Sequence, residues 1–112
     1  MTNDTAILAE LMLSAEQFCS KLEAAMEGRA PTREHEELRR KIAQCRAVLR
    51  EIQKIFEEDK LTIENASVRA DFRHLIMTLL WVAFHAREMI DYKLFRRLVM
   101  IESSFTYLLV CR

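Results

Sequence analysis

Apolar residues recur along most of this chain at alternating steps of three and four, the spacing of one face of an α-helix. Four such stretches can be drawn. They cover residues 4–27, 33–57, 66–89 and 92–111. The pattern predicts an all-α fold, an antiparallel bundle of about four helices with coiled-coil-like seams, which oligomerisation could complete.

The first two stretches carry narrow apolar seams bordered by charged residues. The first seam consists of Leu8, Leu11, Ala15, Phe18, Leu22 and Ala25, and the second of Leu38, Ile42, Cys45, Leu49, Ile52 and Phe56. Asn3 or Asp4 can cap the first helix, and Gly28 can end it because glycine adopts the left-handed conformation without steric cost. Pro31 and Thr32 open the second helix, with Thr32 as its N-cap.

Residues 57–67 are open to two interpretations. Three consecutive acids at 57–59 are unfavourable at the C-terminus of a helix, where the macrodipole is negative. We therefore expect a connection over about 59–65, with Asn65 or Ser67 capping the next helix. The alternative is that the second helix continues through Lys60.

The stretch 72–89 is apolar on nearly every side, which is unusual for a helix in so short a chain. Its seam consists of Val68, Phe72, Leu75, Leu79, Val82, Ala86 and Met89. The fourth stretch uses a different phase, and its seam consists of Leu94, Leu98, Ile101, Phe105 and Leu108. This change predicts a tight turn or a kink at 90–92, where Asp91 can cap the fourth helix.

Composition supports the helical interpretation and narrows the function. The 112 residues include one Gly and one Pro, too few for the turns of a sheet protein, and we expect one domain over 1–112, either complete or cut from a longer chain. The 17 basic and 17 acidic residues cancel, so there is no global attraction to nucleic acid. The uncharged core of the third helix is about a dozen residues, short of the ~20 that span a bilayer. Three cysteines without CxxC spacing indicate free thiols in the cytoplasm or nucleus.

The chain lacks a recognisable catalytic or cofactor-binding pattern. His74 and His85 are eleven residues apart on one helix, about 16 Å at the helical rise, so they cannot share a metal ion. One glycine cannot build a phosphate-binding loop, and Ser103 and Ser104 lack the glycine context of a nucleophile elbow. We therefore expect no enzyme activity, no cofactor and no metal.

A basic stripe on the second helix offers one alternative function. Arg39, Arg46 and Arg50 recur near helical spacing on one flank of the seam. They can bind nucleic acid, although no aromatic residue lies between them to stack on bases. The competing interpretation is that they pair with acidic residues of a neighbouring helix.

The excess apolar surface of the third and fourth helices supplies the main functional hypothesis. A bundle helix normally offers about three-sevenths of its positions to the core, and the third helix offers more. We expect a non-catalytic interaction module, an adaptor or regulatory protein, that forms a homodimer or docks a partner helix. The predicted contact residues are Met77, Trp81, Phe84, Met89 and Tyr107. Alternatively, these residues belong to the core, beneath the fourth helix or the 57–66 segment.

Overall fold

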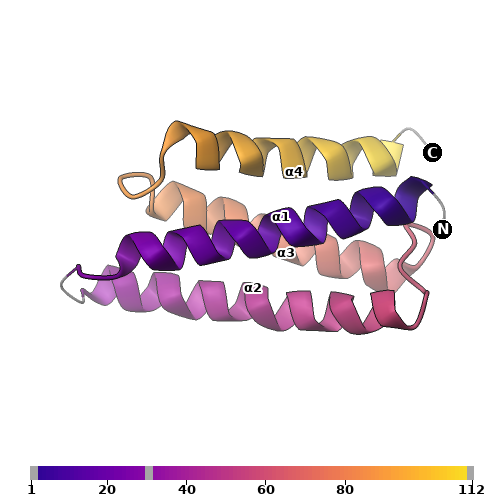
Figure 1. The fold of residues 1–112 in the computed structure, drawn as a ribbon, viewed down its shortest axis with the longest axis horizontal. Helices are drawn as coiled ribbons and strands as arrows, with labels where there is room; N and C mark the ends of the chain where they lie inside the picture. Colours follow the sequence, from indigo (N-terminus) through magenta and orange to yellow (C-terminus); the bar gives the residue numbers. More distant parts are fainter. Residues whose placement is uncertain (1–2, 30–31, 111–112) are drawn as a thin grey trace.

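The structure is a computed structural model that describes residues 3–29 and 32–110, and it contains four helices over those ranges (Figure 1). Helix α1 spans Asn3–Met26, α2 spans Arg33–Glu57, α3 spans Ala66–His85 and α4 spans Tyr92–Val110. Short connections make sequential helices antiparallel. Each of α1 and α3 packs against both α2 and α4, so the helices form a four-helix bundle about 44 Å long. The predicted fold class is confirmed.

The heptad seams form the core. The seam residues named above for 33–57 and 92–111 are buried, apart from Phe56, which is partly buried. In α1 the seam ends on Met26, which is buried, whereas Ala25 is partly exposed. Phe72 of α3 stacks on Phe105 of α4 with ring centroids 5.8 Å apart, which fixes the register of these two helices. Period and phase alone therefore identified most of the helical core, although Cys19, Ile76 and Ala83 are also buried.

Three of the four helices begin at a side-chain cap that the sequence predicts. The Thr32 hydroxyl accepts a hydrogen bond from the His35 amide at 3.1 Å, and the Asn65 side chain accepts one from Ser67 at 2.9 Å. Gly28 follows α1 with φ of 79°. Asn3 and Asp4 both lie inside α1, so neither occupies the predicted cap position. Pro31 and residue 111, expected at two helix ends, lie outside the described residues.

The second helix does not continue through Lys60, so that alternative is wrong. Helix α2 ends at Glu57, and Asp59 adopts φ of 58°, a left-handed conformation that reverses the chain. The connection that follows buries both Leu61 and Ile63. The Leu61 carbonyl accepts a hydrogen bond from the Thr5 hydroxyl at 2.7 Å, and the Ile63 carbonyl accepts one from Arg69 at 2.8 Å. This segment closes one end of the bundle.

The third helix is shorter than the predicted 66–89. It ends at His85, where the Ala86 amide still bonds the Val82 carbonyl, and the His85 ring Nδ1 donates to the Trp81 carbonyl at 2.9 Å. The Met89 amide then bonds the Ala86 carbonyl in a turn. Asp91 accepts a hydrogen bond from the Leu94 amide at 2.8 Å and begins α4. The junction is therefore a turn between antiparallel helices rather than a kink.

Candidate protein-docking surface

The described residues expose ten large apolar side chains, and nine of them lie on α3 and α4. Three are on α3 and six on α4, while α1 contributes Leu13 and α2 contributes none. Single exposed apolar residues scattered over a protein are ordinary, but concentration on two adjacent helices is not. This uneven distribution directs attention to the side of the bundle that α3 and α4 form.

Five of these side chains form two strips, one along α3 and one along α4. On α3 they recur at steps of three and four, and on α4 at a step of four, so each set lies on one helical face. One flank of α3 contacts α2 through Trp81, and one flank of α4 contacts α1 through Arg97. Each apolar strip lies on the other side of its helix, so the two strips border each other. We call this region the α3–α4 outer surface; it consists of Met77, Leu80, Phe84, Phe95 and Val99.

The helix register brings the two strips to the same level. Leu80 lies eight residues after Phe72, and the residue eight before Phe105 is Arg97, between Phe95 and Val99. Because the helices are antiparallel, Leu80 lies level with the middle of the α4 strip. The apolar residues from both helices therefore form one patch near the 86–91 turn.

The predicted contact residues do not all lie on this patch. Met77 and Phe84 do, with 62% and 64% of their surface exposed. The Arg87 guanidinium lies 5.3 Å from the centre of the Phe84 ring, a cation–π contact that orients the ring without covering it. Tyr107 is also exposed, but it lies on the flank of α4 nearer to α1. It follows Met100 by seven residues, or two helical turns, and so lies on the same face of the helix as Met100.

Trp81 and Met89 are partly buried against the core. The indole of Trp81 stacks on the His85 ring with centroids 3.8 Å apart, and the Lys41 ammonium lies 5.2 Å from the indole centre. Together with Glu34, Glu37 and Leu38 of α2, these two rings line a shallow hollow of about 220 Å³. Trp81 thus belongs to the α2–α3 contact and borders the α3–α4 outer surface.

Three members of the surface, Leu80, Phe95 and Val99, were not among the predicted contact residues. Their sequence signal was available in part: Phe95 and Val99 are four apart and adjacent to the core residues Leu94 and Leu98. A second apolar stripe beside a core seam indicates a second covered face. Which flank of α4 faces α3 rather than α1 depends on the bundle's arrangement, which the sequence alone leaves open.

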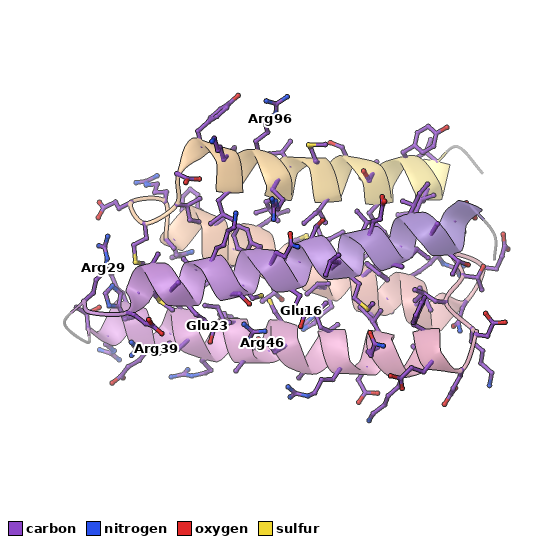
Figure 2. All side chains as sticks on the ribbon, in the orientation of Figure 1. Glu16, Glu23, Arg29, Arg39, Arg46 and Arg96 are labelled. Atoms are coloured by element: carbon purple, nitrogen blue, oxygen red, sulfur yellow. The ribbon has the colours of Figure 1, made fainter. Side chains whose placement is uncertain are left out.

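The predicted basic stripe is divided by an ion pair. Arg46 of α2 and Glu23 of α1 point toward each other between the two helices (Figure 2), and the guanidinium also donates to the Ser20 hydroxyl at 3.2 Å. This hydrogen-bonded carboxylate raises the pKa of Arg46. Arg39 and Arg50 remain exposed. For Arg46 the competing interpretation therefore holds: it pairs with an acidic residue of a neighbouring helix.

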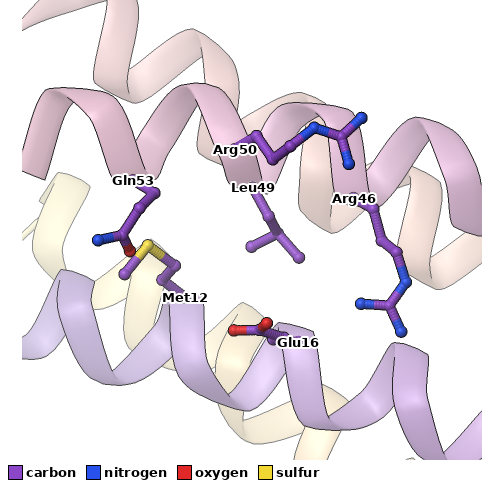
Figure 3. A pocket seen from close by; sticks show the side chains of 6 residues that line it. All are labelled: Met12, Glu16, Arg46, Leu49, Arg50 and Gln53. Carbon is purple, nitrogen blue, oxygen red and sulfur yellow. The ribbon is translucent and has the colours of Figure 1, made fainter.

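Arg50 and a second acid of α1 line the same hollow. A hollow of about 310 Å³ opens between α1 and α2 (Figure 3), and Glu16 faces it from the α1 side, across from Arg46 and Arg50. Its walls also include Met12, Leu49 and Gln53. Because both arginine and glutamate side chains line this hollow, it is not a purely cationic groove of the kind that binds a phosphate backbone.

The buried polar chemistry is that of a packed core. Cys19 and Cys45 are free, fully buried and in hydrogen-bonding contact across α1 and α2. That hydrogen bond, together with burial, raises the pKa of Cys45, which keeps its thiol protonated and unreactive. Over the described ranges, no three His, Cys, Asp or Glu residues are placed to hold a metal ion, and no helix has the length and apolar character needed to span a bilayer.

Comparison of this chain with known protein families, with characterised proteins and with solved structures finds no match.

Proposed function

We propose that this chain is a non-catalytic protein-interaction module that docks a protein partner, or a second copy of itself, on the α3–α4 outer surface. The observation that carries the proposal is the location of nine of the ten exposed large apolar side chains on α3 and α4. Apolar surface left in water is costly at about 25 cal/mol per Å², and a docked protein would remove that cost.

The composition of the surface supports protein docking. Protein interfaces are enriched in aromatic residues and Met and depleted in charge at their centre. Phe84 and Phe95 supply aromatic anchors, and Met77 supplies an adaptable thioether. An adaptor or regulatory role in the cytoplasm or nucleus is consistent with these features, and the free buried thiols of Cys19 and Cys45 support a reducing compartment.

Nucleic-acid binding through Arg39, Arg46 and Arg50 is the weaker alternative. Two observations weigh against it: Glu23 partly neutralises Arg46, and Glu16 shares the hollow with Arg50. A phosphate backbone would have to displace or accommodate these carboxylates.

Site-specific photo-crosslinking in the cells that express the protein tests the proposal. A benzophenone amino acid is placed at Phe84 in one variant and at Ala47, exposed on α2, in a control. We expect a discrete protein adduct at Phe84, lost when Met77→Ser is added, and no such adduct at Ala47. Equal labelling at both positions, or none at Phe84, contradicts the proposed function.

A further inference from the structure

We infer that the α3–α4 outer surface binds a second copy of this chain, face to face, around a two-fold axis parallel to the helices. This inference rests on the proposed function and adds the identity of the occupant. It follows from the register of α3 and α4, from the location of two charges and from the size of the face.

The symmetry determines which residues meet. A two-fold axis parallel to the helices places α3 of one copy over α4 of the other at the same height. The contacts between copies therefore follow the register within one chain, fixed by the stacking of Phe72 on Phe105. Leu80 then lies over Phe95 and Val99 of the second copy, and Phe84 lies over the first turns of its α4 helix.

Charges complete the match at the other end of the face. Arg73 continues the α3 strip one turn before Met77, and Glu102 continues the α4 strip after Val99. By the same register Arg73 is level with Ser104, two residues or about 3 Å along the axis from Glu102. Arg73 of each copy thus meets Glu102 of the other, which gives two symmetric ion pairs.

Both charges are available for such a pair. Across residues 3–29 and 32–110, the ion pairs are Arg46–Glu23, Lys54–Glu51 and Lys60–Glu58, so neither Arg73 nor Glu102 is used in one. Glu102 accepts a hydrogen bond from its own Thr106 hydroxyl at 3.2 Å, which leaves carboxylate lone pairs for a guanidinium. The zero net charge of the chain adds little long-range repulsion between copies.

The area of the face fits a pair of helices better than a single one. Helix α3 has 20 residues and is about 30 Å long, and two adjacent helices are about 20 Å wide, which gives roughly 600 Å² in projection. A stable dimer buries about 800 Å² per partner. The accessible area of this face is comparable, because protruding side chains have more surface than their flat projection. A lone partner helix about 10 Å wide would cover only about half of it.

Sedimentation equilibrium of the full chain tests the inference through a charge swap. The wild-type mass should rise toward twice the 13.2 kDa monomer with concentration in the micromolar range. Arg73→Glu and Glu102→Arg each replace two attractive contacts by two repulsive ones, so each should weaken dimerisation about tenfold to a hundredfold. The double variant restores both pairs with the signs exchanged and should return close to the wild-type constant. Arg39→Glu, on the exposed side of α2, is the matched control and should leave dimerisation unchanged.

Three results would overturn the inference: a wild type that stays monomeric at several hundred micromolar, single reversals that dimerise like wild type, or a double variant that fails to recover. Circular dichroism of all variants checks that they remain folded, as expected for the exposed Arg73 and Arg39 and the partly exposed Glu102. The outcome is distinguishable from failure of the proposed function. A monomeric wild type that still forms a Phe84 adduct with a different protein in cells overturns the second copy and keeps the docking surface, whereas a monomer with no adduct overturns both.

Discussion

Truncation of two phenylalanines on the same helix should destabilise the fold to very different extents. Phe72 is fully buried and stacks on Phe105, whereas Phe84, twelve residues later, is 64% exposed. Removing a buried phenyl ring costs its transfer free energy plus a cavity term, about 3–5 kcal/mol for Phe→Ala. Since a domain of this size is stabilised by about 5–15 kcal/mol, Phe72→Ala should remove a large part of the total.

The cost of Phe84→Ala follows from the part of the ring that the fold covers. A phenylalanine offers about 200 Å², so a side chain about one-third buried loses roughly 70 Å² of coverage, or at most about 1.8 kcal/mol at 25 cal/mol per Å². Alanine regains about 0.5 kcal/mol through its higher helix propensity. We therefore expect a net folding cost of about 1 kcal/mol. The exposed remainder, about 130 Å² and worth up to about 3 kcal/mol, is available only to a docked partner.

Urea denaturation followed by far-ultraviolet circular dichroism measures both costs. The protein should be dilute enough for sedimentation to show a monomer, because a dimer would add its association free energy to the apparent stability. Equal m-values would show that both variants unfold from the same compact state. If Phe84→Ala destabilises the monomer as much as Phe72→Ala does, Phe84 is a core residue and the reasoning about the α3–α4 outer surface fails.

Three further changes test the fold at particular residues by the same denaturation assay. Asp91→Ala removes the cap on the Leu94 amide and should cost about 1 kcal/mol; a cost near zero would show that the cap is dispensable. Ile63→Ala, in the buried connection, should cost about 2–4 kcal/mol, whereas an ordinary surface loop would lose less than 0.5 kcal/mol. Burial and the nearby Glu51 raise the pKa of Asp71 above 3.8, so folding binds a proton and this contribution to stability is lost as pH rises from 3.8 through the raised value. Asp71→Asn should therefore gain stability relative to wild type across that window, and a constant difference would refute this assignment.

Sequence periodicity predicted the core because each seam residue is buried by the geometry of its own helix. Leu8, Phe18, Ile52 and Leu98 all fall on steps of three and four, and all are fully buried. The burial of Leu61 and Ile63 was not predicted, because alternate residues in a short connection have no helical period. Their burial depends on where the connection crosses the end of the bundle, which is a tertiary property.

The composition of the α3–α4 outer surface was only partly predictable for the same reason. The exposure of Met77 and Phe84 could be predicted because the third helix has more apolar faces than a bundle core requires. Trp81 lies on the same helix, but its exposure depends on α2, whose Lys41 and Leu38 lie beside the indole. Met89 follows the helix instead of continuing it, because the chain leaves the helix at Ala86 and the Met89 amide closes a turn on the Ala86 carbonyl.

The central claim is that the α3–α4 outer surface is covered when the protein is at work, and the solvent accessibility of position 77 tests it most directly. Met77→Cys and, as control, Ala47→Cys are each made in a Cys111→Ser background, while the buried Cys19 and Cys45 are retained. Each variant is labelled with a membrane-permeant maleimide in cells and as dilute purified protein. We predict that Cys at position 77 reacts several-fold more slowly in cells than in the purified monomer, whereas Cys at position 47 reacts equally in both. Equal reactivity of position 77 in both settings would contradict the claim.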